Sequence, residues 1–285
     1  MRSQPGDYDL VIAEDLAQAL SLLGSGDEWR PIAGGTDLMV LLNAGRLPYR
    51  QLVSIGKLPE LTSIAVSEEG VTLGAAVTYS EVQRHAVLQT EFPLLCRAAS
   101  WTGGVANQNR GTLGGNIANA SPAADTPPAL LVYDSELELL SRQGSRRVPY
   151  HEFHTGYKVM QLRPDELIAK IRLPRQHAQA VQYARKVGTR KAQAISKVCF
   201  NALAEVESAV IKRFRIGLGS VAPIPFRCLK VEAAVTGQTV TSSLISHVRE
   251  LIAQEIHPID DIRSTASYRS LVTQNLLSEF LGRFL

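Results

Sequence analysis

Two glycine-rich turns constrain the fold of this chain more than any other feature of its sequence. In the first, residues 32–37, a strand-like stretch leads into Gly34 and Gly35 and then into Thr36 at the start of a helical pattern. Glycine lets the backbone approach a ligand closely, and the N–H groups and dipole at a helix start favour phosphate. A Gly-Gly turn by itself, however, is more often a plain turn than a ligand site.

The second turn lies within residues 107–128, where clusters of Gly, Asn and Pro leave little periodicity. We therefore predict a long irregular segment here, and such segments in compact domains are usually functional. Residues 109–119 can offer several backbone N–H groups to one anion. Two glycine loops on separate units suit a pyrophosphate, which carries two anionic phosphates, and together they predict a pyrophosphate site.

Other sequence motifs of nucleotide binding and catalysis are either absent or lack the structural context that they require. Residues 217–222 match the G-x-G-x-x-A pattern after a strand, but Pro223 and Pro225 follow at once. Proline inside a helix costs about 3 kcal/mol, so the helix that this fingerprint needs cannot start there. We interpret the stretch as a strand end with a turn. The sequence also lacks a P-loop and a nucleophile elbow, and no pair of carboxylates stands out.

The distribution of charge argues against a nucleic-acid partner. The 285 residues carry 30 basic and 27 acidic side chains, a formal net charge of +3, and most cations are scattered among anions. Residues 185–191 form one dense basic patch. A solvated turn and a cluster that meets an anionic ligand are both open interpretations of this patch.

What the sequence lacks indicates where the protein acts. No apolar run approaches the ~20 residues needed to cross a bilayer, so we expect no membrane span. The first residues show no signal peptide, and Cys96, Cys199 and Cys228 are widely spaced with no C-x-x-C pair. We expect free thiols in a cytoplasmic protein, without an iron–sulfur cluster of its own. His151 and His154 lie in an apparent loop, where we expect no metal site.

Hydrophobic periodicity predicts a mixture of helices and strands. Thr78 and Glu81 form a capping box that opens a helix through about residue 86. The other predicted helices include residues 14–23, 37–42, 242–256 and 267–285, and the predicted strands include residues 51–55, 71–75, 136–139, 198–206 and 214–218. A loop-like composition at residues 174–180 precedes a pattern typical of an α+β domain.

These residues resemble a known family. Residues 33–38 and 110–116 are similar to the two flavin loops of the FAD-binding medium subunit of molybdenum hydroxylases, the xanthine dehydrogenase and carbon monoxide dehydrogenase type. Further similar blocks follow in the family's order, at residues 73–78, 121–125, 165–168, 219–223 and 261–269. The resemblance therefore covers nearly the whole chain, and the ordered blocks are more specific than either loop alone.

The resemblance implies a fold of class α+β. Residues 1–175 would form a PCMH-type, vanillyl-alcohol-oxidase-like FAD-binding domain, with subdomains at about 1–56 and 57–175. Residues 180–285 would form a C-terminal α+β domain of the CO dehydrogenase flavoprotein type.

The resemblance also implies a set of cofactor contacts. Asp125 would hydrogen-bond the sugar or ribityl part of FAD, Ile168 would make a backbone contact near the flavin, and Lys186 would approach the flavin, where a cation stabilises the anionic reduced form. We expect non-covalent FAD, because neither loop contains His or Cys. The pyrophosphate would be held by Pro31, Ile32, Ala33, Gly34, Gly35, Thr36, Asp37 and Leu38 and by Thr112, Leu113, Gly114, Gly115 and Asn116.

The function implied is that of an electron relay without catalytic acid–base residues of its own. A large partner subunit would carry the molybdopterin cofactor and a small one the [2Fe–2S] clusters, in a dimer of heterotrimers. Electrons would pass through FAD to NAD⁺ or another acceptor. Two alternatives are a self-sufficient flavin reductase or oxidase of the same fold, which needs its own acid beside the flavin, and a flavin-free scaffold subunit.

Overall fold

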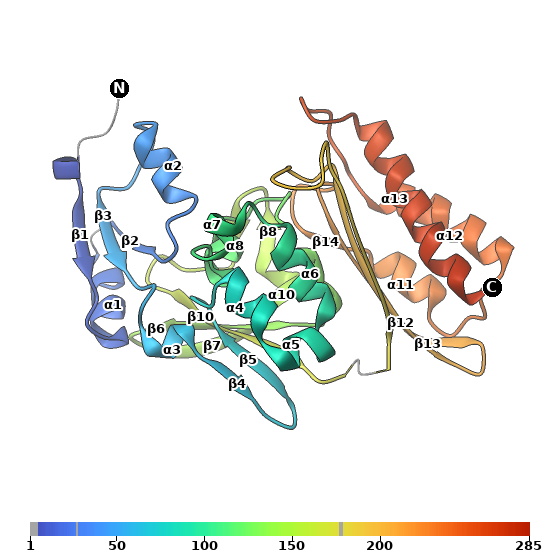
Figure 1. Cartoon of the computed structure of the whole chain (residues 1–285), viewed down its shortest axis with the longest axis horizontal. Helices are drawn as coiled ribbons and strands as arrows, with labels where there is room; N and C mark the ends of the chain where they lie inside the picture. Colours follow the sequence, from blue (N-terminus) through green and yellow to red (C-terminus); the bar gives the residue numbers. More distant parts are fainter. Residues whose placement is uncertain (1–4, 27, 177–178) are drawn as a thin grey trace.

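The computed structural model describes residues 5–26, 28–176 and 179–285. Figure 1 shows that the chain forms three units in sequence order, each built on its own sheet. The first two units belong to the predicted flavin domain and the third to the predicted C-terminal domain. No helix among the described residues is long and apolar enough to cross a membrane.

The first unit is a parallel sheet in the order β1-β3-β2 with helices between its strands. Its elements are β1 (Asp9–Ile12), α1 (Leu16–Leu23), β2 (Trp29–Ile32), α2 (Leu38–Asn43) and β3 (Gln51–Ser54), preceded by a 3-10 turn at Pro5–Asp7. The side chain of Asp15 caps α1 by accepting from Gln18 N at 2.7 Å. The predicted helices and the strand β3 are confirmed, whereas β1 was not predicted.

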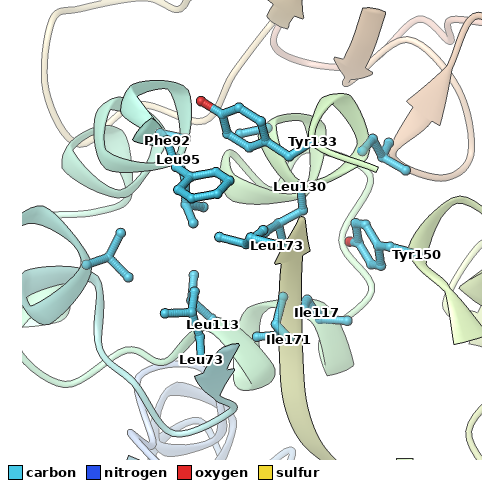
Figure 2. Packing of buried hydrophobic residues seen from close by; sticks show 14 of the residues in the cluster. Leu73, Phe92, Leu95, Leu113, Ile117, Leu130, Tyr133, Tyr150, Ile171 and Leu173 are labelled. Carbon is cyan, nitrogen blue, oxygen red and sulfur yellow. The ribbon is translucent and has the colours of Figure 1, made fainter. Parts of the chain in front are cut away.

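The second unit is an antiparallel sheet in the order β4-β5-β10-β6-β7, covered by short helices. Leu113 and Ile117 point from one of these helices into the core that Figure 2 shows, together with Phe92 and Tyr133. The elements are α3 (Pro59–Thr62), β4 (Ile64–Val66), β5 (Gly70–Gly74), α4 (Tyr79–Arg84), α5 (Ala86–Glu91), α6 (Pro93–Trp101), α7 (Val105–Gln108), α8 (Leu113–Ala118), α9 (Thr126–Val132), β6 (Glu136–Ser141), β7 (Gly144–Pro149), α10 (Tyr150–Phe153), β8 (His154–Gly156), β9 (Val159–Met160) and β10 (Leu167–Pro174).

Two predictions for this unit were wrong. Residues 107–128 are not one irregular segment, because they include α8 and the beginning of α9. Helices of this length show no sequence period, and tertiary contacts rather than propensity hold them. The apparent loop between His151 and His154 is α10, whose Tyr150 and Phe153 are buried in the core.

The predicted capping box is confirmed and fixes α4 in place. Glu81 N donates to Thr78 Oγ1 at 3.3 Å, and Thr78 N donates to the Glu81 carboxylate at 2.7 Å. The next residue, Tyr79, donates its N–H to Gly111 O at 3.1 Å. The start of α4 is therefore tied to the second glycine-rich loop.

The third unit is an antiparallel sheet in the order β11-β12-β13-β14. Helices α11, α12 and α13 cover the face that points away from the second unit (Figure 1). The elements are β11 (Val181–Val187), β12 (Val198–Glu207), β13 (Val210–Gly219), β14 (Phe226–Arg227), α11 (Leu229–Val235), α12 (Ser242–Glu255), α13 (Ala266–Leu281) and a final 3-10 turn (Gly282–Phe284). Residues 217–222 form a strand end and a turn, as interpreted from the sequence, and α11 was not predicted.

The other face of this sheet receives α9 of the second unit at backbone distance. A Cβ atom at Gly217 would lie 2.3 Å from Pro128 O, so only glycine permits this approach. Beside it, Arg227 donates to Glu232 at 2.8 Å and to Asp134, which follows α9 in the second unit. Arg215 also donates to Asp134, at 3.0 Å. These largely buried charges tie the second and third units together.

Arg227→Met should lower the free energy of unfolding by about 3–5 kcal/mol, because it leaves Asp134 and Glu232 without their main partner. Urea denaturation of the full chain measures the change. The control is Arg147→Met, whose ion pair with Glu136 is exposed to solvent and should contribute about 0–1 kcal/mol. Equal stability of the two variants would contradict this assignment.

Candidate functional site

The first glycine-rich loop leaves β2 and enters α2 with its backbone donors free. Gly35 has φ of +74°, a conformation that glycine adopts readily. No described residue accepts a hydrogen bond from the backbone N–H groups of residues 33–37. None of the five residues is buried, and Thr36 and Asp37 are exposed. The loop therefore has unpaired backbone donors of the kind an anionic ligand needs, and anion binding by it stays a prediction.

The second loop is anchored differently from the prediction. Leu113 N donates to Val77 O at 3.0 Å, Gly114 N donates to Ala75 O at 2.8 Å, and Gly115 N donates to the Thr112 hydroxyl at 3.1 Å. The expectation that these N–H groups are free for an anion was wrong, because they hold the start of α8 in place. This loop contributes a closely packed backbone surface rather than a row of free donors.

The two loops meet backbone to backbone. A Cβ atom at Gly34 would lie 1.9 Å from Arg110 O and 3.1 Å from Gly111 Cα. The Arg110 side chain returns to the first loop, where its Nε donates to Gly34 O at 3.2 Å. Segments far apart in the sequence thus contact each other through their backbones, and only glycine at position 34 allows this approach.

Asp125 and Lys186 form a buried ion pair between the second and third units. Lys186 Nζ lies 2.7 Å from Asp125 Oδ2, and both side chains are 9% exposed. Lys186 also donates to Trp101 O at 2.9 Å, and Ser196 Oγ donates to Asp125 Oδ1 at 2.6 Å. Burial raises the pKa of Asp125 above its ordinary value, and Lys186 and Ser196 oppose that rise.

This pair resolves the two interpretations of the basic patch. Lys186 lies on β11 and points into the protein, so the solvated-turn interpretation is wrong for it. Arg185, its neighbour, pairs instead with Glu279 in solvent, where both side chains are about half exposed.

The pair lies beside the second glycine-rich loop. Thr126, which follows Asp125, donates its hydroxyl to Asn116 Oδ1 at 2.6 Å. Burial and the charge of Asp125 together raise the pKa of Tyr79, whose ring packs against Gly111. The structure therefore brings Asp125, Lys186 and the second loop together, and the contact at Gly34 adds the first loop.

Ile168 lies on β10, under the anchored start of α8. Its side chain is 3% exposed and belongs to the hydrophobic core, so it is not available to a ligand. The following residue, Ala169, accepts from Ala75 N at 2.9 Å, and Ala75 in turn accepts from Gly114 N. Sequence reasoning missed Ser196 and Trp101, because neither belongs to a recognisable motif.

Comparison with known proteins identifies the family. Residues 6–176 match the family described as the FAD binding domain in molybdopterin dehydrogenase. Residues 183–284 match the CO dehydrogenase flavoprotein C-terminal domain. The chain belongs to this flavoprotein family. It is accordingly an oxidoreductase subunit of the xanthine and carbon monoxide dehydrogenase type, with FAD as its cofactor, and the predicted family is confirmed.

Curated relatives match along almost the whole chain. The xanthine dehydrogenase FAD-binding subunit of Escherichia coli O157:H7 is 31% identical over 95% of this chain and 93% of its own length. The glyceraldehyde dehydrogenase medium chain of Sulfolobus acidocaldarius is 30% identical over 95% of this chain and 96% of its own.

Solved structures show the same fold. Carbon monoxide dehydrogenase from Hydrogenophaga pseudoflava matches with a TM-score of 0.92 and 24% identity, over 97% of this chain and 96% of that chain. Quinoline 2-oxidoreductase from Pseudomonas putida 86 matches with a TM-score of 0.89 and 23% identity, over 100% and 99%. The predicted α+β architecture of a PCMH-type domain with a C-terminal domain is confirmed.

The residues present fit a dinucleotide cofactor in their chemistry, because the first loop has unpaired backbone donors and packs on the second loop, and a buried ion pair lies beside the second loop. Gly34→Ala should separate the loops, lower stability by about 1–3 kcal/mol and weaken FAD binding. Thermal unfolding and quenching of FAD fluorescence measure these effects. Gly282→Ala is the control, since nothing lies within 4 Å of its Cβ position. Unchanged FAD affinity in Gly34→Ala would contradict the proposed meeting of the loops at the cofactor.

Proposed function

We propose that this chain is the FAD-binding medium subunit of a molybdopterin-dependent hydroxylase or dehydrogenase, and that it relays electrons between partner subunits and an acceptor. The contact of the two glycine loops, together with the Asp125–Lys186 pair beside the second loop, carries the proposal, because it brings segments that are far apart in the sequence close to a buried ion pair. Bound FAD would accept electrons singly and release them as a pair.

Each part of the site has a distinct role in this proposal. Residues 31–38 bind the pyrophosphate through the free N–H groups of the first loop. Residues 112–116 form the surface against which it lies. Asp125 accepts from the sugar or ribityl hydroxyls, because a carboxylate has more acceptor sites than Lys186 and Ser196 use. Ile168 provides a backbone contact, and Lys186 places a cation near the flavin ring.

The partners are inferred from the relatives. Their names describe a FAD-binding subunit and a medium chain of larger dehydrogenases. We propose a small [2Fe–2S] subunit, a large molybdopterin subunit and a dimer of heterotrimers, with NAD⁺ or another acceptor receiving the electrons. We also propose the domain bounds 1–175 and 180–285. A cytoplasmic location is supported by Cys96, Cys199 and Cys228, which are free thiols.

The first experiment is to purify the chain and record its visible absorption spectrum before and after acid precipitation. A yellow protein that releases FAD into the acid supernatant, identified by mass, is the expected result. Apoprotein that refuses added FAD would favour a flavin-free scaffold. Flavin retained in the pellet would indicate a covalent link. Substrate turnover by the isolated chain would favour a self-sufficient flavin enzyme.

Lys186→Met should lower the midpoint potential of the bound flavin by about 30–60 mV, because a nearby cation favours the negative charge added on reduction. The titration is performed at alkaline pH, because high pH favours the ionised form of Asp125, whose pKa is raised by burial. Lys191→Met, at an exposed position in the same basic patch, is the control and should leave the potential unchanged. Equal potentials in both variants would exclude Lys186 from the flavin's surroundings.

A further inference from the structure

Arg269 is a buried cation that the cofactor site described above does not use. It lies in the first turns of α13 and is 2% exposed. Its Nη1 donates to Lys197 O at 2.8 Å and to Ser220 O at 3.1 Å, and its Nη2 donates to Asp261 Oδ1 at 2.7 Å. One guanidinium therefore joins the start of β12, the turn after β13 and the loop before α13.

The two turns that Arg269 joins lead directly to Asp125. Ser220 Oγ donates to Ser196 O at 2.8 Å, and Ser196 Oγ donates to Asp125 Oδ1 at 2.6 Å. Ser220 has φ of +66°, and its N–H donates to Pro122 O at 2.8 Å, three residues before Asp125. This strained turn is thus bound to the cofactor segment on one side and to Arg269 on the other.

The same guanidinium also reaches the surroundings of Lys186. Lys197, whose carbonyl accepts from Arg269, donates its N–H to Val187 O at 2.7 Å. Val187 follows Lys186 on β11. Both members of the Asp125–Lys186 pair are therefore connected to Arg269 through short hydrogen-bonded paths.

We propose that Arg269 is a positioning residue for FAD, which acts through Ser196 to hold Asp125 in one orientation. The inference rests on the proposed function, in which Asp125 binds the cofactor. Asp125 is held at one oxygen by Ser196 and at the other by Lys186, so its carboxylate cannot rotate. Without Arg269, the carbonyls of Lys197 and Ser220 lose their donor, the turns repack and the Ser196 hydroxyl loses its direction. A cofactor contact is effective only when its supporting hydrogen bonds fix its geometry.

The test compares Arg269→Lys, Ser196→Ala and the double variant in the full chain. Lysine keeps the charge but cannot span three acceptors as the planar guanidinium does. Each single substitution should raise the Kd for FAD about tenfold, the loss of one hydrogen bond to a charged group. The double variant should bind FAD no more weakly than the single variant with the higher Kd, because both residues act along one path. Fluorescence titration gives the Kd and urea denaturation the stability.

Arg227→Lys provides a matched control. Arg227 is another largely buried arginine that joins the third unit to the second, but it does so through Asp134 rather than Asp125. The Arg227→Lys variant should therefore be less stable than the wild type but bind FAD with the wild-type Kd. If Arg269→Lys behaves like Arg227→Lys, with lower stability and an unchanged Kd, Arg269 is only structural and the proposal is overturned. If the increase in the Kd for FAD in the double variant equals the product of the increases in Arg269→Lys and Ser196→Ala, the two residues act independently and the path through Ser196 is overturned.

A milder substitution keeps the proposal testable if Arg269→Lys does not fold. Asp261→Asn removes the charge that orients Arg269 at a position with 22% side-chain exposure. It should raise the Kd for FAD about two- to threefold, and an unchanged Kd would overturn the role of Arg269. Failure of the wild-type chain to bind FAD is a separate outcome, which contradicts the proposed function and the inference with it.

Discussion

The buried ion pair between Asp125 and Lys186 is the interaction on which the arrangement of the site depends. Removing both charges from water is costly, and such a pair is tolerated only where further hydrogen bonds satisfy its remaining atoms. Ser196 and the carbonyl of Trp101 supply them here. Because the four residues come from different elements, the pair forms only when the second and third units are correctly docked.

Close backbone packing makes that docking possible. The carbonyl of Pro128 in α9 lies where a side chain at Gly217 would be, and the carbonyl of Arg110 lies where one at Gly34 would be. In both places glycine is required because it has no side chain, so the two backbones can pack in direct contact. These glycine contacts thus set the position of the first loop. In that position the backbone N–H groups of residues 33–37 have no hydrogen-bond acceptor among the described residues.

Sequence reasoning succeeded where a signal is local or long. The capping box at Thr78 depends on residues three apart, and α12 is long enough to show a hydrophobic stripe. It failed at α8 and α10, which are too short to carry a period and are held by buried side chains from distant parts of the core. The expectation of free N–H groups after Thr112 was also wrong. These groups donate to Val77 and Ala75, which belong to another segment of the chain and cannot be recognised as acceptors from the sequence around Thr112.

The sequence by itself determined the family and the fold class and supplied the candidate residues for the cofactor site, because ordered motifs and turn-forming glycines are encoded locally in the chain. Only the tertiary structure decided which of them act together. It placed Lys186 of the basic patch opposite Asp125 and added Ser196, which belongs to no recognised motif, and Arg269, which ends the block at residues 261–269 but had no predicted role in the site. A hydrogen bond across 71 residues has no local signature, so its partners become visible only when the chain is folded.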